Sequence, residues 1–262
     1  MVKTHRWDSP ETVLRIGKWE VESRNGKVET TVMSGTLYVV ATPIGNLEDI
    51  TYRAVRVLGG AAIIFAEDTR RTGLLLKRYE IDVPMRPYHD HNKEKVTPGI
   101  LARLEGDESV ALVSDAGTPG ISDPGFYLVV RAIERGVPVV PVPGPTAVVC
   151  ALSAAGLPTD RFEMVGFLPK KAGRRDRLLE ELVNRGHTVV VYESARRLPE
   201  TLRALAGIAP EARVVIGREL TKLHEEWMRG TATEVRERLG DAILKGEIVL
   251  LFHGGKKERK SR

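Results

Sequence analysis

Residues 114–125 read SDAGTPGISDPG and directly follow the apolar run Val110–Val113. Three glycines, two prolines and two aspartates in twelve residues are more than a plain turn requires. Because glycine has no Cβ, such a stretch lets another group approach the main chain closely. Asp123 and Pro124 are typical N-cap and first-turn residues of a helix. We therefore predict a loop that leads from a strand into a helix and binds a ligand.

Apolar runs and helical patterns alternate on both sides of this loop. The expected strands are 37–41, 61–66, 110–113 and 139–142, and the expected helices are 49–58, 69–78, 96–104 and 126–134. Strands that read as continuous apolar runs, joined by helices, indicate a mostly parallel sheet covered on both faces. Ligands of such sheets bind at the carboxyl ends of the strands, which is where the loop 114–125 lies.

The second half of the chain repeats this order less regularly. Strands are expected at 162–166, 188–192, 213–216 and 248–252, and helices near 175–182, 198–206 and 233–239. We predict an N-terminal extension (1–34) with a hairpin turn at Asn25-Gly26, two α/β domains (35–145 and 146–255) and a basic tail (256–262).

Composition limits the classes of protein and partner. Lys and Arg outnumber Asp and Glu by 40 to 35, and the resulting pI near 9.3 favours a polyanionic partner. Cys150 is the only cysteine, which excludes an internal disulfide and a cysteine-based zinc site and indicates a reducing, cytoplasmic compartment. Residues 137–158 carry no charge, but five prolines interrupt them, so we expect a strand, a turn and a short helix here and no membrane span.

The usual phosphate-binding motifs are missing. The sequence has no G-x-x-x-x-G-K-[ST] and no G-x-G-x-x-G after the first strand. That strand instead runs into residues 41–47, ATPIGNL, in which the proline removes a backbone donor and fixes the turn. A loop of this kind favours a ligand held by shape and carbonyl groups over a phosphate held by amides.

Eight stretches occur in order between residues 37 and 252: ATPIGNLEDIT (41–51), AEDTRRTG (66–73), YHDHN (88–92), SDAGTPGISDPG (114–125), PGPTAVVCALSAAGLP (143–158), GFLPKK (166–171), YESARRL (192–198) and RELTKLHEE (218–226). Together they resemble the tetrapyrrole-methylase-fold enzymes. The closest subgroup methylates the ribose 2′-hydroxyl of a cytidine in the decoding region of bacterial small-subunit rRNA. The resemblance implies two α/β domains with S-adenosylmethionine in the cleft between them, and a homodimer.

Two features depart from these relatives. Tetrapyrrole-modifying members carry Asp-Pro where this chain has Thr118-Pro119, which speaks against a porphyrinoid substrate. Members of the rRNA subgroup commonly continue into a small C-terminal helical module, whereas this sequence ends ten residues after Phe252. Docking of the substrate through such a module is therefore not implied for this chain.

The resemblance also assigns cofactor contacts. A methyl donor without phosphate is expected to bind by close backbone contact in a largely apolar site. The positions that match the cofactor loops of the fold are Pro43, Ala116, Gly117, Thr118, Ile121, Thr146 and Ala147, and, in the later segments, Glu193 and Glu219.

Methyl transfer to a hydroxyl needs an in-line nucleophile, and a general base helps to remove its proton. The candidates are Glu67, Asp68, His89 and Glu219, with His91, Glu193 and His224 also open, and the sequence does not choose among them. Asp68 is equally well explained as a helix N-cap. His89 and His91 have a spacing that metal ligands also use, but without a cysteine or carboxylate motif around them we expect no metal.

Basic residues gather near the expected ends of strands. Clusters of this kind neutralise phosphates in a salt-sensitive way, whereas a solvated helix face is the simpler alternative for each cluster. The expected RNA contacts are Arg70, Arg71, Lys170, Lys171, Arg174, Arg175, Arg196, Arg197 and Lys222.

The sequence therefore predicts a 2′-O-methyltransferase of 16S rRNA that uses S-adenosylmethionine and acts on the 30S subunit. A tetrapyrrole or precorrin methyltransferase of the same fold and a non-catalytic RNA-binding assembly factor remain as alternatives.

Overall fold

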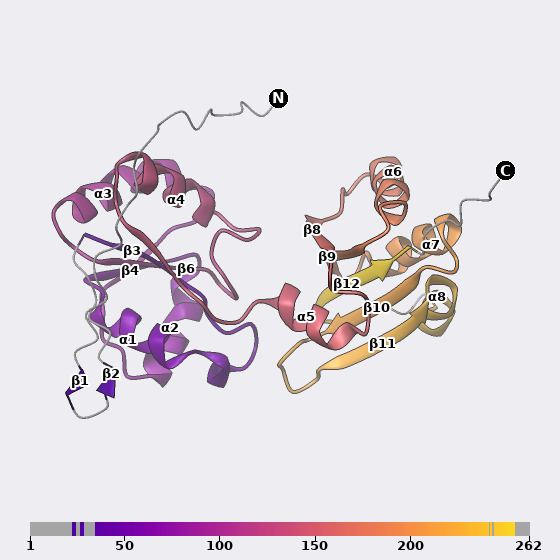
Figure 1. Cartoon of the computed structure of the whole chain (residues 1–262), viewed down its shortest axis with the longest axis horizontal. Coiled ribbons are helices and arrows are strands. Elements are labelled where there is room, and N and C mark those ends of the chain that lie inside the picture. Colours follow the sequence, from indigo (N-terminus) through magenta and orange to yellow (C-terminus); the bar gives the residue numbers. More distant parts are fainter. Residues whose placement is uncertain (1–22, 25–26, 29–34, 241, 243, 255–262) are drawn as a thin grey trace. The chain divides into compact units, whose positions relative to one another are not determined.

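The structure is a computed structural model that describes residues 23–24, 27–28, 35–240, 242 and 244–254 (Figure 1). By their contacts, these residues form two compact units. The chain passes from the first to the second unit after Val142, close to the predicted boundary, but the loops 41–50 and 114–118 also belong to the second unit. Most of the predicted extension and the tail 256–262 lie outside the described residues. Within the extension, β1 (Ser23–Arg24) pairs antiparallel with β2 (Lys27–Val28), as the expected hairpin requires.

The first unit contains a parallel sheet of five strands. They are β3 (Leu37–Val40), β4 (Ile63–Ala66), β5 (Met85–Pro87), β6 (Val110–Val113) and β7 (Val139–Val142), in the order β5-β4-β6-β3-β7. Every neighbouring pair is parallel, so the expected sheet type is confirmed here. Strands β3, β4 and β6 are buried along their whole length, as their unbroken apolar sequences predict. No expected strand corresponds to β5, which has only three residues, one of them partly buried and two exposed.

Four helices cover this sheet: α1 (Tyr52–Gly60), α2 (Thr69–Arg78), α3 (Lys93–Glu105) and α4 (Gly125–Glu134). In Figure 1, α3 and α4 lie on one face of the sheet and α1 and α2 on the other. Helix α1 begins three residues later than expected, because Thr51 caps it by accepting from the Ala54 N–H. Asp123 is not the N-cap of α4, which is Pro124; its carboxylate instead accepts from the N–H groups of Gly120 and Gly125, at 2.5 and 2.9 Å.

The sheet of the second unit is mainly antiparallel, which the sequence did not predict. Its strands are β8 (Phe162–Phe167), β9 (Thr188–Ser194), β10 (Arg213–Arg218), β11 (Glu226–Thr231) and β12 (Glu247–His253), in the order β11-β10-β12-β9-β8. Only β8 and β9 are parallel neighbours. Strand β11 returns from β10 as a hairpin, and β12 inserts antiparallel between β9 and β10. These long-range pairings have no signal in the hydrophobic pattern of single strands.

Helices cover both faces of this second sheet. Helix α5 (Ala147–Ala155), the expected short helix, packs on one face, where it contacts Val190 and Val249. Helices α6 (Ala172–Val183), α7 (Leu198–Ile208) and α8 (Ala232–Leu239) pack on the other, against Val189 and Val191. Neighbouring residues of one strand thus enter different cores, as the two-residue period of a strand dictates. None of the helices formed by the described residues is both long and apolar enough to cross a bilayer.

Candidate functional site

Two loops leave the first sheet from the neighbouring strands β3 and β6. The chain runs from β3 through α1 to β4 and from β6 through α4 to β7, so the two connections lead toward opposite edges of the sheet. Open α/β sheets bind ligands at such a point. Here the N–H of Thr42 donates to the Gly117 carbonyl and the N–H of Gly117 donates to the Thr42 carbonyl, both at 2.9 Å. Gly117 has a φ of 81°, which glycine adopts without strain.

A third loop, residues 143–146, packs against the first two. A Cβ on Gly144 would lie 3.0 Å from the Cβ of Ala41, so any larger residue would require a shift. The hydroxyl of Thr118 donates to the Pro145 carbonyl at 3.4 Å. The three loops are therefore joined mainly through main-chain atoms and small side chains.

A fourth loop, residues 219–222, follows β10. The N–H of Asn46 donates to Thr221 Oγ1 at 3.1 Å, and a Cβ on Gly45 would lie 2.8 Å from the same oxygen. Glu219 and Thr221 have φ values of 50° and 67°, a conformation that costs a non-glycine residue about 1–2 kcal/mol. Residues held in this way gather at binding sites. We call the four segments, all in the second unit, the loop cluster: 41–46, 114–118, 143–146 and 219–222.

The carboxylate of Glu219 holds the fourth loop in place. Its Oε1 accepts from the Glu247 N–H at 2.8 Å and from Lys222 Nζ at 2.9 Å, and these hydrogen bonds lower the pKa of Glu219. Burial of Lys222 favours its neutral form, but the carboxylates of Glu219 and Glu247 outweigh burial and raise the pKa of Lys222. Both groups are thus ionised at neutral pH, and Glu219 is poorly suited to accept a proton.

Behind the loop cluster lies the apolar core around α5. Ile44 and Leu220, from two of the loops, pack with Val148 of α5 in that core. A largely apolar lining with few directed polar groups fits a ligand that has no phosphate. Most of the predicted cofactor residues lie in the loop cluster or at the start of α5: Pro43, Ala116, Gly117, Thr118, Thr146, Ala147 and Glu219. Ile121 belongs to the first unit and is exposed.

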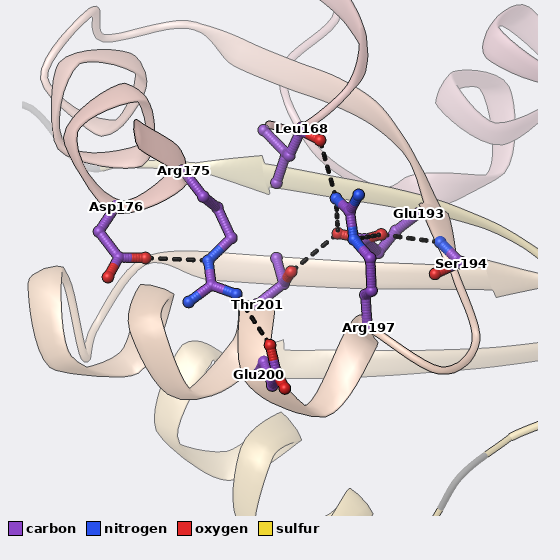
Figure 2. Close-up of polar contacts among 8 residues, drawn as sticks. All are labelled: Leu168, Arg175, Asp176, Glu193, Ser194, Arg197, Glu200 and Thr201. Carbon is purple, nitrogen blue, oxygen red and sulfur yellow. Dashed lines mark hydrogen bonds and ion pairs between the residues drawn. The ribbon is translucent and has the colours of Figure 1, made fainter. Parts of the chain in front are cut away.

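Glu193 occupies a different environment, at the end of β9 and only 2% exposed (Figure 2). Its Oε2 accepts from the Thr201 hydroxyl at 2.7 Å, and its Oε1 accepts from the Ser194 N–H at 2.8 Å. The guanidinium of Arg197 lies 3.1 Å from Oε1 and also donates to the Leu168 carbonyl at 2.8 Å. Both oxygens already accept hydrogen bonds from groups inside the unit. A contact between this carboxylate and the cofactor stays a prediction, and these hydrogen bonds do not favour it.

Three of the catalytic candidates lie together in the first unit. Glu67 and Asp68 follow β4, and His89 follows the neighbouring parallel strand β5. Asp68 is the N-cap of α2, and its hydrogen bonds from the side chain and N–H of Arg70 lower its pKa to about 2. A carboxylate so weakly basic is a poor proton acceptor. His89 is half-buried, and its Nδ1 has no hydrogen-bond partner among the described residues.

The two histidines of the predicted pair contact each other. The rings of His89 and His91 meet edge to face, with centroids 6.0 Å apart. Within the described ranges, no three His, Cys, Asp or Glu side chains come together in a way that could hold a metal ion.

The predicted RNA-binding cations divide into two groups. Arg175 is 7% exposed and pairs with Asp176 and Glu200, and Arg197 pairs with Glu193 (Figure 2). Lys222 pairs with Glu219. Carboxylates of the second unit already neutralise the charges of these three residues. We therefore do not include them among the proposed RNA contacts. The other six residues are exposed, although Arg70 also pairs with Asp68: Arg70, Arg71, Lys170, Lys171, Arg174 and Arg196.

Sequence reasoning missed three residues of the loop cluster. Gly45 and Asn46 stand in the stretch ATPIGNL, and Thr221 stands in RELTKLHEE, but none of them was singled out. The available signal was Gly45, directly after Pro43-Ile44, because a glycine at this position marks a close approach. Its partner Thr221 is 176 residues further along the chain and could not be read from the sequence.

Known proteins resemble this chain over most of its length. Residues 36–236 match the family of Tetrapyrrole (Corrin/Porphyrin) Methylases. The Ribosomal RNA small subunit methyltransferase I of Halalkalibacterium halodurans is 48% identical over 220 residues, which cover 84% of this chain and 76% of that protein. The protein of the same name from Escherichia coli O157:H7 is 46% identical over 233 residues, 86% of this chain and 80% of that protein.

Solved structures share the fold at lower identity. Uroporphyrin-III C-methyl transferase from Thermus thermophilus, complexed with S-adenyl homocysteine, has a TM-score of 0.59 at 21% identity and covers 83% of this chain and 97% of that chain. A cobalt precorrin-4 methyltransferase has a TM-score of 0.62 at 19% identity and covers 83% and 94%. The chain therefore belongs to the tetrapyrrole methylase family and, within it, to the group of the ribosomal RNA small subunit methyltransferases I.

Proposed function

We propose that the protein transfers a methyl group from S-adenosylmethionine to the ribose 2′-hydroxyl of a cytidine in the decoding region of 16S rRNA. Membership of its group makes it a methyltransferase of small-subunit rRNA. The observation that carries the proposal is the 48% identity to such a methyltransferase over 84% of this chain. The 2′-hydroxyl as the methylated group and cytidine as the target nucleotide are what the sequence resemblance implies.

The loop cluster supports S-adenosylmethionine as the methyl donor. Gly117 and Gly144 allow close approach of main chain, Pro43 removes an amide, and the core behind the cluster is apolar. These properties suit an adenosine linked to a sulfonium better than a phosphate. A solved relative with this fold is complexed with S-adenyl homocysteine, the demethylated form of the same molecule.

When bound, the cofactor supplies a methyl group on a positively charged sulfur. The chain must then position the ribose and accept the proton of its hydroxyl. Asp68 and Glu219 are bound to Arg70 and Lys222 and have lowered pKa values, whereas Nδ1 of His89 has no hydrogen-bond partner among the described residues. His89 is therefore the first residue to test as the proton acceptor. His89→Gln should lower kcat without changing the affinity for S-adenosylhomocysteine.

The exposed cations support an RNA substrate. Arg70 and Arg71 stand at the start of α2, beside the strand ends that carry Glu67 and His89. In the second unit, Lys170 and Lys171 directly precede α6. Such groups contact phosphates, and their binding weakens as salt rises. Binding to the assembled 30S subunit, a homodimeric state and a cytoplasmic location remain predictions.

The test is to incubate labelled S-adenosylmethionine with free 16S rRNA, 30S subunits and a uroporphyrinogen-type tetrapyrrole, and then to map the ribose methylation. We expect label in the rRNA at one 2′-hydroxyl of the decoding region. Label in the tetrapyrrole alone would establish the small-molecule alternative. Binding of 30S subunits without label in any substrate would establish an assembly factor.

A further inference from the structure

An aromatic side chain stands at the carboxyl end of β8. Phe167 is 63% exposed, although it is the last residue of a strand. Its ring contacts that of Tyr192 on the neighbouring strand β9, with centroids 5.7 Å apart and an angle of 55° between the planes. Tyr192 is partly buried, and its ring packs against the exposed ring of Phe167 and supports it.

The backbone of β8 directs Phe167 to this position. Met164 lies opposite Val190 and Gly166 lies opposite Val191, so Val165 has no partner and forms a β-bulge. Gly166 has a φ of 73°, which glycine permits. Because successive residues of a strand point to opposite faces, the extra residue changes the face to which Phe167 points. Without the bulge, Phe167 would point to the face covered by α6 and α7.

The face that Phe167 joins is the one that bears the loop cluster. Tyr192 packs against the core around α5, which also contains Ile44 and Leu220 of the loop cluster. The carboxyl end of β10, where the loop 219–222 begins, lies at the same edge of this sheet as the carboxyl ends of β8 and β9. Phe167 therefore lies on the same face and at the same end of this sheet as the loop 219–222, with β9 and β12 between β8 and β10.

Exposed positive charges follow the carboxyl ends of β8 and of its neighbour β9. Lys170, Lys171 and Arg174 follow β8 directly, and Arg196 follows the neighbouring strand β9. An exposed ring bordered by cations is the arrangement with which proteins hold unpaired nucleotides: the ring stacks on a base and the cations contact phosphates. A uniformly apolar protein partner would gain nothing from these charges.

From these contacts we propose that Phe167 stacks on an unpaired base of the RNA substrate, next to the ribose to be methylated. This inference rests on the proposed function and adds the residue that fixes the base. Only 5% of the residues are Phe, Trp or Tyr, but one ring placed by a bulge is sufficient to stack on one base.

The experiment compares three variants of the full-length protein on 30S subunits. Phe167→Ala should raise KM, or lower kcat/KM, by about tenfold, the usual loss for one stacked base. Phe167→Trp should keep most of the activity, and its added fluorescence should be quenched by an oligonucleotide of the target sequence. Phe162→Ala is the matched control, because Phe162 is 45% exposed at the opposite end of the same strand. It should leave KM unchanged.

The other outcomes separate the inference from the proposed function. All variants should bind S-adenosylhomocysteine as the wild type does. If Phe167→Ala methylates RNA with wild-type KM and kcat, the stacking inference is wrong while the proposed function stands. If Phe167→Ala keeps wild-type RNA affinity but changes the sedimentation of the protein, the occupant of this surface is a second copy of the chain. A wild-type protein that methylates no rRNA overturns the proposed function and this inference together.

Discussion

The loop cluster and the surroundings of Glu193 both contain residues that the sequence predicts as cofactor contacts, but different kinds of groups hold the two regions together. The loop cluster joins four segments through main-chain groups, glycines and small side chains. The Glu193 network, formed by Glu193, Arg197 and Thr201, joins charged and polar side chains in the interior of the second unit. The first arrangement leaves main chain accessible to a ligand, whereas the second satisfies its polar groups internally.

The difference shows which sequence signals indicate function. A glycine placed between two loops indicates close approach, and this property does not depend on the rest of the fold. A pair of neighbouring arginines in the sequence indicates positive charge, but not whether each side chain lies in solvent or in the interior. Arg174 and Arg196 are exposed, whereas their immediate neighbours Arg175 and Arg197 are paired with carboxylates. Neighbouring side chains on a helix or turn point in different directions, and this determines which arginine is exposed. The number of arginines in the cluster does not determine it.

The largest effect is expected from breaking the Glu193 network. Glu193→Ala removes the carboxylate that pairs with Arg197 and accepts from the Thr201 hydroxyl, and loss of one partner of a buried pair costs about 3–5 kcal/mol. Urea denaturation should show this loss in the free energy of unfolding. The control is Glu200→Ala, whose 64% exposed side chain pairs with Arg175, and which should cost less than about 1 kcal/mol. If Glu193→Ala is as stable as the wild type but no longer binds S-adenosylhomocysteine, the role of Glu193 is cofactor binding and not stabilisation of the fold.

The next effect concerns the loop cluster itself. Gly45→Ala places a Cβ 2.8 Å from Thr221 Oγ1 and 3.0 Å from the Leu220 carbonyl, so the loops 41–46 and 219–222 must separate. We expect the affinity for S-adenosylhomocysteine to fall by about 10- to 100-fold, or about 1.4–2.7 kcal/mol, as measured by calorimetry. The control is Gly59→Ala in α1, where the new Cβ would meet no atom within 4 Å apart from its chain neighbours and the backbone of its own helix. Equal affinities for the two variants would contradict a binding role of the loop cluster.

The hydrophobic pattern predicted most of the first unit and much of the site. The fully buried runs of β3, β4 and β6 gave a parallel sheet, and glycine and proline in 114–125 gave the loop at its edge. Strand β11 was missed because its residues, from Glu226 to Thr231, are all at least partly exposed and show no apolar alternation. The antiparallel order of the second sheet depends on pairings between distant strands, which a local pattern does not contain.

Site residues were predictable where the backbone, and not a distant partner, defines their role. Gly117 could be chosen from its own loop. Thr221 could not, since its function as an acceptor for the Asn46 N–H depends on a contact across 175 residues. Phe167 was equally hidden, because the bulge at Val165 that directs its ring is visible only in the pairing with β9.

A smaller effect separates the members of one arginine pair. Arg196→Ala removes an exposed cation, so the affinity for 16S rRNA should fall a few-fold and the slope of log affinity against log salt should decrease by about 1. Arg197→Ala should instead lower the melting temperature, because it leaves Glu193 buried and unpaired. Filter binding at several salt concentrations, together with thermal unfolding, measures both. Matching salt slopes for Arg196→Ala and the wild type would remove Arg196 from the RNA surface.

The smallest effect is a dependence of stability on pH at Asp68, on the edge of the first sheet. Its pKa is lowered from the usual value of about 3.9 to about 2, chiefly by the side chain of Arg70, so the folded state favours the ionised form. The resulting stabilisation is complete above about pH 5 and is lost as the pH falls toward 2. In Asp68→Asn this contribution is absent, so the melting temperatures of the two proteins should differ at pH 6 and converge near pH 2. High salt should reduce the difference at pH 6, because Arg70 is exposed and salt screens the pair. A difference that persists unchanged at pH 2 would show that Asp68 acts through the neutral hydrogen bonds of its cap and not through its charge.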